Sequence, residues 1–450
     1  MIGALRAYLA RPGIGPQLVK AVVGSAGLRL LGMGLGFLVG VQLARGLGPA
    51  GYGAYGTAMA IISVLMVPTE LGLPQLVTRE VAAALASDGD GATTAIVRWA
   101  RRVVALSSLA IASIAFLALL CGLTSVGHDE RVALTFGLLW IPIVAIGNIY
   151  GAALRGMRKV LSGQVGEIFA RPAIVSLLLW VVVRKSPSTL DPATAMCINV
   201  VSALIGAALS VMLLRRFSRR AAPLTQAVPA DLRFVQALPI AMTEGMRVLA
   251  GQVSILVLAA LASRSDVGLY RVASGVYIAS TMPSALINAA CSPTISRLFT
   301  QGKSRELARL NIWCSAFLCL AAVAFVCFQL LYGKAAVSLL FGAAYVDAAA
   351  LLLIFLVGEA IASLFGHPSV VLNMMRRPAV VMWWSAAGLL ANAAATWLLV
   401  PRLGSSGAAF GTAAGLVTWR AGCAIYAKRR LGMDTGLVTT LITAEVGSAA

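Results

Sequence analysis

Charged side chains are scarce in this sequence. Of its 450 residues only 12% are Asp, Glu, Lys or Arg, 60% are apolar, and the mean hydropathy is +0.90. A typical soluble domain has about twice that share of charged residues. The scarcity excludes a water-soluble globular protein and indicates that lipid surrounds most of the chain.

Histidine is almost missing, and cysteine occurs without a metal-binding or disulfide pattern. The two histidines are His128 and His367, and the seven cysteines include no Cys-x-x-Cys pair. An odd number of scattered cysteines predicts neither a disulfide framework nor a zinc site. We therefore expect no metal and no cofactor, and we assign both histidines a structural role.

Acidic residues are outnumbered by basic ones, 16 to 36, which gives a net charge of +20. In a soluble protein this excess would indicate nucleic acid, but here the basic residues lie between apolar runs of about 20 residues, each long enough to cross a bilayer. We therefore expect no nucleic-acid partner. The runs predict an all-α polytopic protein of about twelve transmembrane helices, over residues 18–44, 54–77, 102–124, 132–154, 164–183, 195–214, 237–262, 267–292, 311–333, 347–372, 379–401 and 407–427.

The placement of the basic residues predicts the orientation of the chain. If the N-terminus is cytoplasmic, basic residues on the inner side of the spans outnumber those on the outer side by about three to one, as the positive-inside rule requires. This predicts an inner-membrane protein with both termini in the cytoplasm.

An internal repeat divides the chain into two halves. Gly53-Ala54-Tyr55-Gly56-Thr57-Ala58 and Gly268-Leu269-Tyr270-Arg271-Val272-Ala273 share the pattern Gly-x-Tyr-x-x-Ala, and each follows the first span of its half. We call the register that places Gly53 on Gly268 the repeat alignment. A basic, proline-containing linker from Arg215 to Arg233 lies between the halves. We predict two pseudo-symmetric six-helix bundles, with lobes over residues 1–222 and 223–450 and the substrate between them.

Several short motifs resemble those of a known transporter family. They fall in order along nearly the whole chain: Ala44-Arg45-Gly46-Leu47-Gly48-Pro49, Glu70-Leu71-Gly72-Leu73-Pro74, Asp266-Val267-Gly268-Leu269-Tyr270, Leu340-Phe341-Gly342 and Val400-Pro401-Arg402-Leu403-Gly404. In these pieces the sequence resembles the polysaccharide transporter family of the multidrug/oligosaccharidyl-lipid/polysaccharide export superfamily, which contains the O-antigen and exopolysaccharide flippases.

The resemblance implies a flippase rather than an enzyme. Its cargo would be an undecaprenyl-diphosphate-linked oligosaccharide, moved from the inner to the outer leaflet of the bacterial inner membrane by alternating access. The product would enter lipopolysaccharide or exopolysaccharide biosynthesis. The implied partners are the lipid-linked oligosaccharide, membrane lipid, and a polysaccharide polymerase with its assembly proteins.

Charged residues inside the predicted spans are the candidate site residues, because burying a charge in a bilayer costs about 2.5 to 3.5 kcal/mol on insertion scales. The repeat alignment places Arg29 on Glu244, one helical turn before Arg247. In the fold that the resemblance implies, the first and seventh helices both line a central cavity between the two bundles. We therefore predict that Arg29 and Arg247 bind the substrate diphosphate there and that Glu244 neutralises them in the empty state. The alternative is an ion pair with a structural role alone.

Isolated carboxyl groups in apolar spans are candidates for ion coupling. Glu70 and Glu359 fit this description, since an isolated carboxyl group in an apolar helix exchanges a proton readily. By contrast, Glu167 and Arg171 are four residues apart, and we expect them to pair with each other.

Two other functional classes remain open at this stage. A multidrug or ion antiporter of the same superfamily would share the helix count, but organic cations favour an acidic cavity, and the arginines here favour an anion. A membrane glycosyltransferase or polymerase normally has paired carboxylates or a large outer loop. The sequence shows neither.

Overall fold

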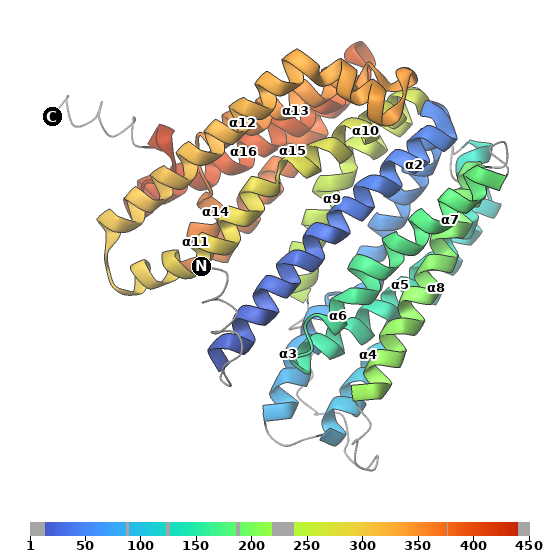
Figure 1. Ribbon diagram of the computed structural model, residues 1–450, viewed down its shortest axis with the longest axis horizontal. Helices are drawn as coiled ribbons and strands as arrows, with labels where there is room; N and C mark the ends of the chain where they lie inside the picture. Colours follow the sequence, from blue (N-terminus) through green and yellow to red (C-terminus); the bar gives the residue numbers. More distant parts are fainter. Residues whose placement is uncertain are drawn as a thin grey trace. The chain divides into compact units, whose positions relative to one another are not determined.

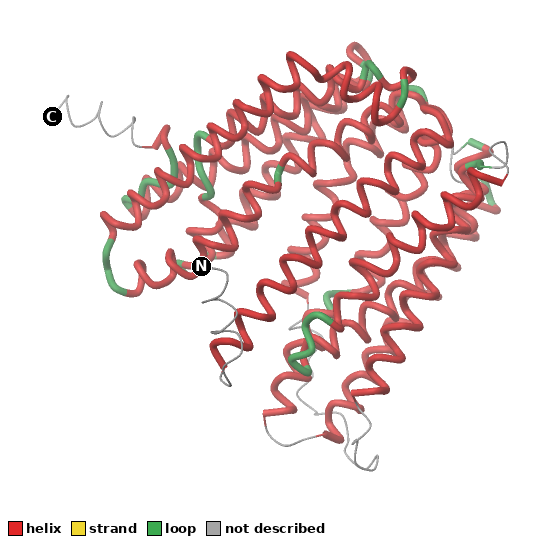
Figure 2. The backbone as a smooth tube through the Cα atoms, in the orientation of Figure 1, coloured by secondary structure: helices red, strands yellow, loops and turns green. Residues whose placement is uncertain are grey.

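A computed structural model describes residues 14–86, 90–122, 127–185, 190–217, 238–375 and 377–439. Every regular element in these ranges is a helix (Figure 2). The predicted all-α class is confirmed.

The helices divide at the middle of the chain (Figure 1). The first half contains α2 (Ile14–Glu70), α3 (Leu73–Ala86), α4 (Asp90–Leu120), α5 (His128–Gly156), α6 (Ser162–Gln164), the π-helix η1 (Val165–Ala170), α7 (Arg171–Lys185) and α8 (Pro192–Phe217). The second half contains α9 (Leu238–Leu261), α10 (Arg264–Ser280), α11 (Met282–Thr300), α12 (Ser304–Phe341), the 3-10 helix η4 (Ala343–Tyr345), α13 (Ala348–Ser363), α14 (Pro368–Met374), α15 (Pro378–Leu403) and α16 (Ser405–Leu431).

The element α2 is two helices joined at a glycine. Gly48 has φ 68° and ψ 174°, a conformation that an L side chain rarely adopts, so the first helix ends before it and the second begins after it. A second left-handed step at Leu71 and Gly72 separates α2 from α3. Both breaks fall within the motifs that carry the family resemblance.

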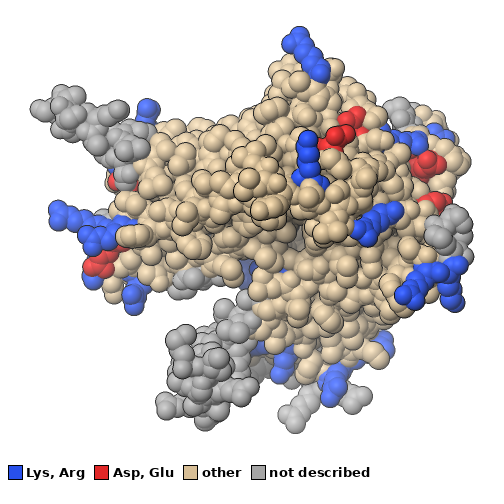
Figure 3. Space-filling model, turned by 45° about the horizontal axis from the view of Figure 1, so that its top comes forward, with Lys and Arg blue, Asp and Glu red and all other residues tan. Residues whose placement is uncertain are grey.

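Apolar length supports a multi-pass membrane protein. Seven described helices are long and apolar enough to cross a bilayer, or eight if α13 and α14, which meet at a 47° bend, form one span. Each of the twelve predicted ranges overlaps a described helix, although 54–77, 267–292 and 347–372 cross a helix break and the number twelve itself stays a prediction. Large apolar side chains are exposed along α12, where Leu339 is 75% and Leu331 is 74% exposed, as expected of a lipid-facing surface. Uncharged residues make up most of the face in Figure 3.

The chain forms two compact units. Unit 1 contains residues 1–47 and 61–245, and unit 2 contains residues 48–60 and 246–450. The short stretch 48–60 therefore packs with the second half of the chain although it belongs to the first half in sequence. The predicted lobe boundary, between residues 222 and 223, lies outside the described residues.

Small residues determine how closely the helices pack. In unit 1, α5 lies at the centre and contacts α3, α4 and α8, with buried Leu73, Val77 and Ile149 among the core side chains. In unit 2, α15 and α16 form an antiparallel hairpin through Gly404. A Cβ on Gly388 would lie 2.7 Å from the Gly415 carbonyl oxygen, so this pair requires glycine at the contact.

Candidate functional site

A cleft opens inside unit 1 between α5, η1, α7 and α8. It is narrow, with a volume of about 20 Å³, enough for about one water molecule. Its walls are mostly backbone and small side chains, with a few polar groups: Val144, Gly147, Asn148, Gly151, Gly163, Gly166, Glu167, Arg171, Ala203, Gly206, Ala207 and Ser210.

The π-helix beside this cleft has a local cause in the sequence. Pro172 has no N–H to donate to the carbonyl of Ile168, and its ring would clash with that carbonyl in a regular helix. The chain widens instead, and the N–H of Arg171 donates to the carbonyl of Gly166, five residues earlier. Gly32 of α2 packs against this site, because a Cβ there would lie 2.6 Å from the Ile168 carbonyl oxygen.

Glu167 and Arg171 lie at this widened turn. The expected ion pair between them is not formed in the described part of the chain, where Glu167 is exposed and the Arg171 guanidinium lies 5.3 Å from the centre of the Trp140 ring. Residues four apart on a helix can pair, but here the Arg171 guanidinium lies over an aromatic ring instead. Both charges are therefore left in the cleft wall as separate groups.

The carboxylate of Glu70 lies close to this cleft. It accepts a 2.6 Å hydrogen bond from Nδ2 of Asn148, a residue of the cleft wall. Asn148 is a neutral donor, so the bond satisfies the carboxylate without cancelling its charge. Glu70 was expected to be isolated, and in the structure it has this partner.

Arginines accompany these carboxylates. Arg155 donates through Nη1 to the carbonyl of Gly163 at 3.1 Å. It lies within electrostatic range of three charged side chains, those of Glu167, Glu70 and Arg29. Arg29 is thus part of a mixed-charge cluster inside unit 1.

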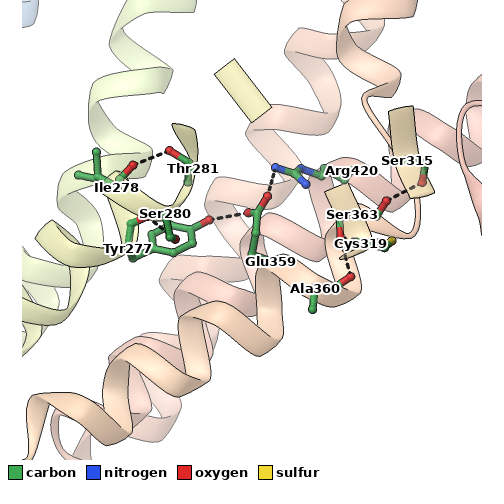
Figure 4. A network of polar contacts seen from close by, with 10 residues as sticks. All are labelled: Tyr277, Ile278, Ser280, Thr281, Ser315, Cys319, Glu359, Ala360, Ser363 and Arg420. Atoms are coloured by element: carbon green, nitrogen blue, oxygen red, sulfur yellow. Dashed lines mark hydrogen bonds and ion pairs between the residues drawn. The ribbon is translucent and has the colours of Figure 1, made fainter. Parts of the chain in front are cut away.

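A second polar cluster lies inside unit 2 and joins three helices (Figure 4). Arg420 of α16 donates through Nη2 to Glu359 Oε1 at 2.8 Å, and Tyr277 of α10 donates to Glu359 Oε2 at 2.7 Å. Glu359 is 6% and Arg420 is 9% exposed. The carboxylate, expected to be isolated, is thus held in a buried ion pair.

The same unit contains an uncharged network of hydroxyl and amide groups. Ser254 of α9 donates to Asn392 of α15 at 2.9 Å, and Thr396 donates to the same oxygen at 3.0 Å. Thr412 of α16 links Ser254 to Tyr270 of α10, at 2.9 and 2.8 Å. Four helices are therefore joined by polar groups that satisfy one another, which stabilises their packing in lipid.

The three residues predicted to bind substrate belong to different units. Arg29 lies in unit 1, whereas Arg247 lies on α9 in unit 2, and both side chains are exposed. The side chain of Glu244 lies outside those the structure describes. Their meeting at one site stays a prediction.

Sequence reasoning missed three participants. Arg155, Arg420 and Tyr277 were not among the candidate residues predicted from the sequence. The position of Arg420 inside an apolar helix was a usable signal, because such a charge requires a partner. Tyr277 gave no signal, since tyrosine is common at membrane interfaces.

The sequence family is decided by one match. A family model described as polysaccharide biosynthesis protein matches residues 18–299, more than half of the chain. This chain belongs to that family. The resemblance inferred from the motifs is confirmed.

Solved structures share the fold of this polysaccharide biosynthesis protein at low identity. A multidrug resistance MATE family transporter of the MOP superfamily, in its inward-facing conformation, has a TM-score of 0.77 at 12% identity, covering 91% of this chain and 98% of that one. The lipid II flippase MurJ, in an inward closed conformation, has a TM-score of 0.69 at 13% identity, covering 91% and 87%. A MOP superfamily transporter from Pyrococcus furiosus has a TM-score of 0.63 at 12% identity, covering 92% and 96%. No curated protein sequence matches this chain.

Proposed function

We propose that this protein is a flippase. Its cargo is an undecaprenyl-diphosphate-linked oligosaccharide, which it moves from the inner to the outer leaflet of the bacterial inner membrane by alternating access. The product enters lipopolysaccharide or exopolysaccharide biosynthesis, and a polymerase with its assembly proteins acts next. Membership of the polysaccharide biosynthesis family and a fold shared with a lipid II flippase support this proposal.

The observation that carries the proposal is the charge of the unit 1 cluster. Three arginines, Arg29, Arg155 and Arg171, share this part of the fold with two carboxylates, those of Glu70 and Glu167. An excess of positive charge at membrane depth is costly unless an anion compensates it. A diphosphate supplies that anion, and the planar guanidinium group suits its oxygens in a two-bond geometry.

Within this proposal Arg29 is the first contact of the diphosphate in unit 1. Arg155 lies within electrostatic range and adds to the local positive potential. As predicted from the sequence, Arg247 binds the diphosphate together with Arg29, and the carboxylate of Glu244 neutralises the arginines when the site is empty.

We assign ion coupling to Glu70 before Glu359. When Glu70 is protonated, its carbonyl oxygen can still accept the hydrogen bond from Asn148, and no charge is left without a counter-ion. Protonating Glu359 would leave Arg420 charged, buried and without its counter-ion. Glu359 exchanges a proton only if Arg420 finds another partner in the same step.

The second candidate is a multidrug or ion antiporter, which the likeness to a multidrug resistance transporter favours. Organic cations need an acidic site. The arginine excess of the unit 1 cluster opposes this alternative.

The deciding experiment measures flipping of a fluorescent undecaprenyl-diphosphate-linked oligosaccharide in proteoliposomes. We expect Arg29→Ala and Arg155→Ala each to lower the rate at least tenfold, and Lys at either position to restore part of it, since lysine keeps the charge but loses the two-bond geometry. The control is Arg184→Ala, because Arg184 lies on the Trp180 ring at the far end of α7 and is exposed. Full activity in the Arg29→Ala Arg155→Ala double variant would refute the assigned diphosphate site.

A further inference from the structure

The two copies of the internal repeat motif contact each other in the structure. A methyl group on Gly53 would collide with the carbonyl oxygen of Arg264, and a methyl group on Gly268 would collide with the carbonyl oxygen of Pro49. In the repeat alignment Arg264 is the equivalent of Pro49, as Gly268 is of Gly53. Each contact is therefore the repeat equivalent of the other, so the two helix starts cross on a local two-fold axis.

The side chain of Arg271 occupies the space on this axis. Arg271 donates through Nη1 to the carbonyl of Gly56 at 3.2 Å, and these two residues are again equivalents in the repeat alignment. Equivalent residues on a two-fold axis face each other, so only one of them has room for a side chain. A Cβ on Gly56 would collide with the Arg271 side chain, which explains why glycine stands opposite the arginine.

Two tyrosines hold the guanidinium group. Arg271 lies 5.5 Å from the ring centres of both Tyr52 and Tyr55, whose rings are stacked with 12° between their planes. Within the described part of the chain Arg271 pairs with no carboxylate. The contact, which we call the repeat clasp (Gly53, Gly268, Arg271, Tyr52 and Tyr55), thus consists of backbone packing, one hydrogen bond and cation–π contacts.

The path of the chain gives the clasp a mechanical role. Residues 48–60 pack in unit 2, but the chain enters unit 1 directly before and directly after them. At the near end Gly48 supplies a left-handed joint. At the far end the helix continues through residues 57–67 without proline or glycine, and such a helix does not bend sharply. A movement of unit 1 against unit 2 therefore acts on the clasp.

We propose that the repeat clasp is a releasable joint that opens and closes once in each transport cycle, with Arg271 as its latch. On the predicted topology it lies at the outer face, where the cargo leaves. This inference rests on the alternating-access transport proposed above.

A pair of spin labels tests whether the clasp opens. Ala50 and Ser265 are both exposed and are repeat equivalents, one beside each half of the clasp. Both are changed to Cys in a variant whose seven native cysteines are replaced, and label distances are measured by pulsed electron paramagnetic resonance. We expect two populations of molecules, one with a short and one with a long distance between the labels. The population with the long distance should increase on addition of lipid-linked oligosaccharide and in an Arg271→Gln variant. One unchanged distance in all three conditions would overturn the proposal.

Bridging the same two cysteines tests whether opening is required. A reducible bifunctional thiol reagent, matched to the short distance, should lower flipping at least tenfold, and reduction should restore it. The control retains native Cys291 and Cys314, whose sulfur atoms lie 3.3 Å apart on α11 and α12, and bridging them should leave flipping unchanged. Full flipping with the clasp bridged would overturn the proposal. If the labels show two distances but no variant flips the oligosaccharide, the clasp stands and the assigned cargo is wrong.

Discussion

Removing one partner of the Glu359–Arg420 pair should destabilise unit 2 strongly. In Arg420→Met the carboxylate of Glu359 stays buried and keeps the Tyr277 hydroxyl as its remaining partner at 2.7 Å. Breaking a buried ion pair in this way costs about 3 to 5 kcal/mol. That corresponds to a loss of roughly two to three and a half orders of magnitude in the folding equilibrium constant.

The double variant Glu359→Leu Arg420→Met should recover most of this loss. Replacing both ions by apolar groups of similar volume removes the two desolvation penalties together, which is often neutral or stabilising. The measurement is unfolding of the purified protein in detergent micelles, followed by the accessibility of a buried cysteine. Lys303→Met is the matched control: Lys303 and Glu306 pair at 3.0 Å with side chains 51% and 58% exposed. Such an exposed pair contributes at most about 1 kcal/mol.

The result that refutes this reasoning is a double variant as unstable as Arg420→Met alone. It would mean that the ion pair itself, and not the penalty of an uncompensated charge, stabilises the three helices. An Arg420→Met variant that unfolds like the Lys303→Met control would likewise show that Glu359 is neutral in the folded protein.

Three further outcomes are expected from the fold. Gly32→Val should lower the yield of folded protein, because its side chain meets a backbone carbonyl of η1, whereas Gly36→Val, with no heavy atom within 4 Å of the new Cβ, should behave like the parent in size-exclusion chromatography. Pro172→Ala should let the π-helix close to an α-helix, which hydrogen exchange will report as stronger protection of residues 165–171. Reporter fusions after Arg430 should indicate cytoplasm and those near His128 periplasm; the reverse pattern would overturn the orientation predicted from the arginines.

The membrane spans were determined by the sequence alone. Apolar runs of about 20 residues have few options in lipid, because a backbone that cannot bond to water must form helices. Each of the twelve predicted ranges accordingly overlaps a described helix, but three of them cross a helix break that the apolar runs did not reveal. The predicted joint between residues 44 and 54 contains the break at Gly48, but the predicted span 54–77 ran through the break at Leu71 and Gly72, where positive φ ends the helix.

Side-chain partners were decided by tertiary structure. Glu359 and Arg420 are 61 residues apart and Tyr277 is 82 residues from Glu359, distances over which sequence spacing gives no information. The expected Glu167–Arg171 pair is not formed, because the Arg171 guanidinium lies over the ring of Trp140 on α5. The π-turn beside it has a local cause, Pro172, but Gly32 of another helix packs on its Ile168 carbonyl. The repeat was visible in the sequence as two Gly-x-Tyr-x-x-Ala motifs, but a sequence motif does not predict whether equivalent residues of the two copies contact each other. The fold brought Gly53 and Gly268 together, because glycine alone allows two helix backbones to approach that closely.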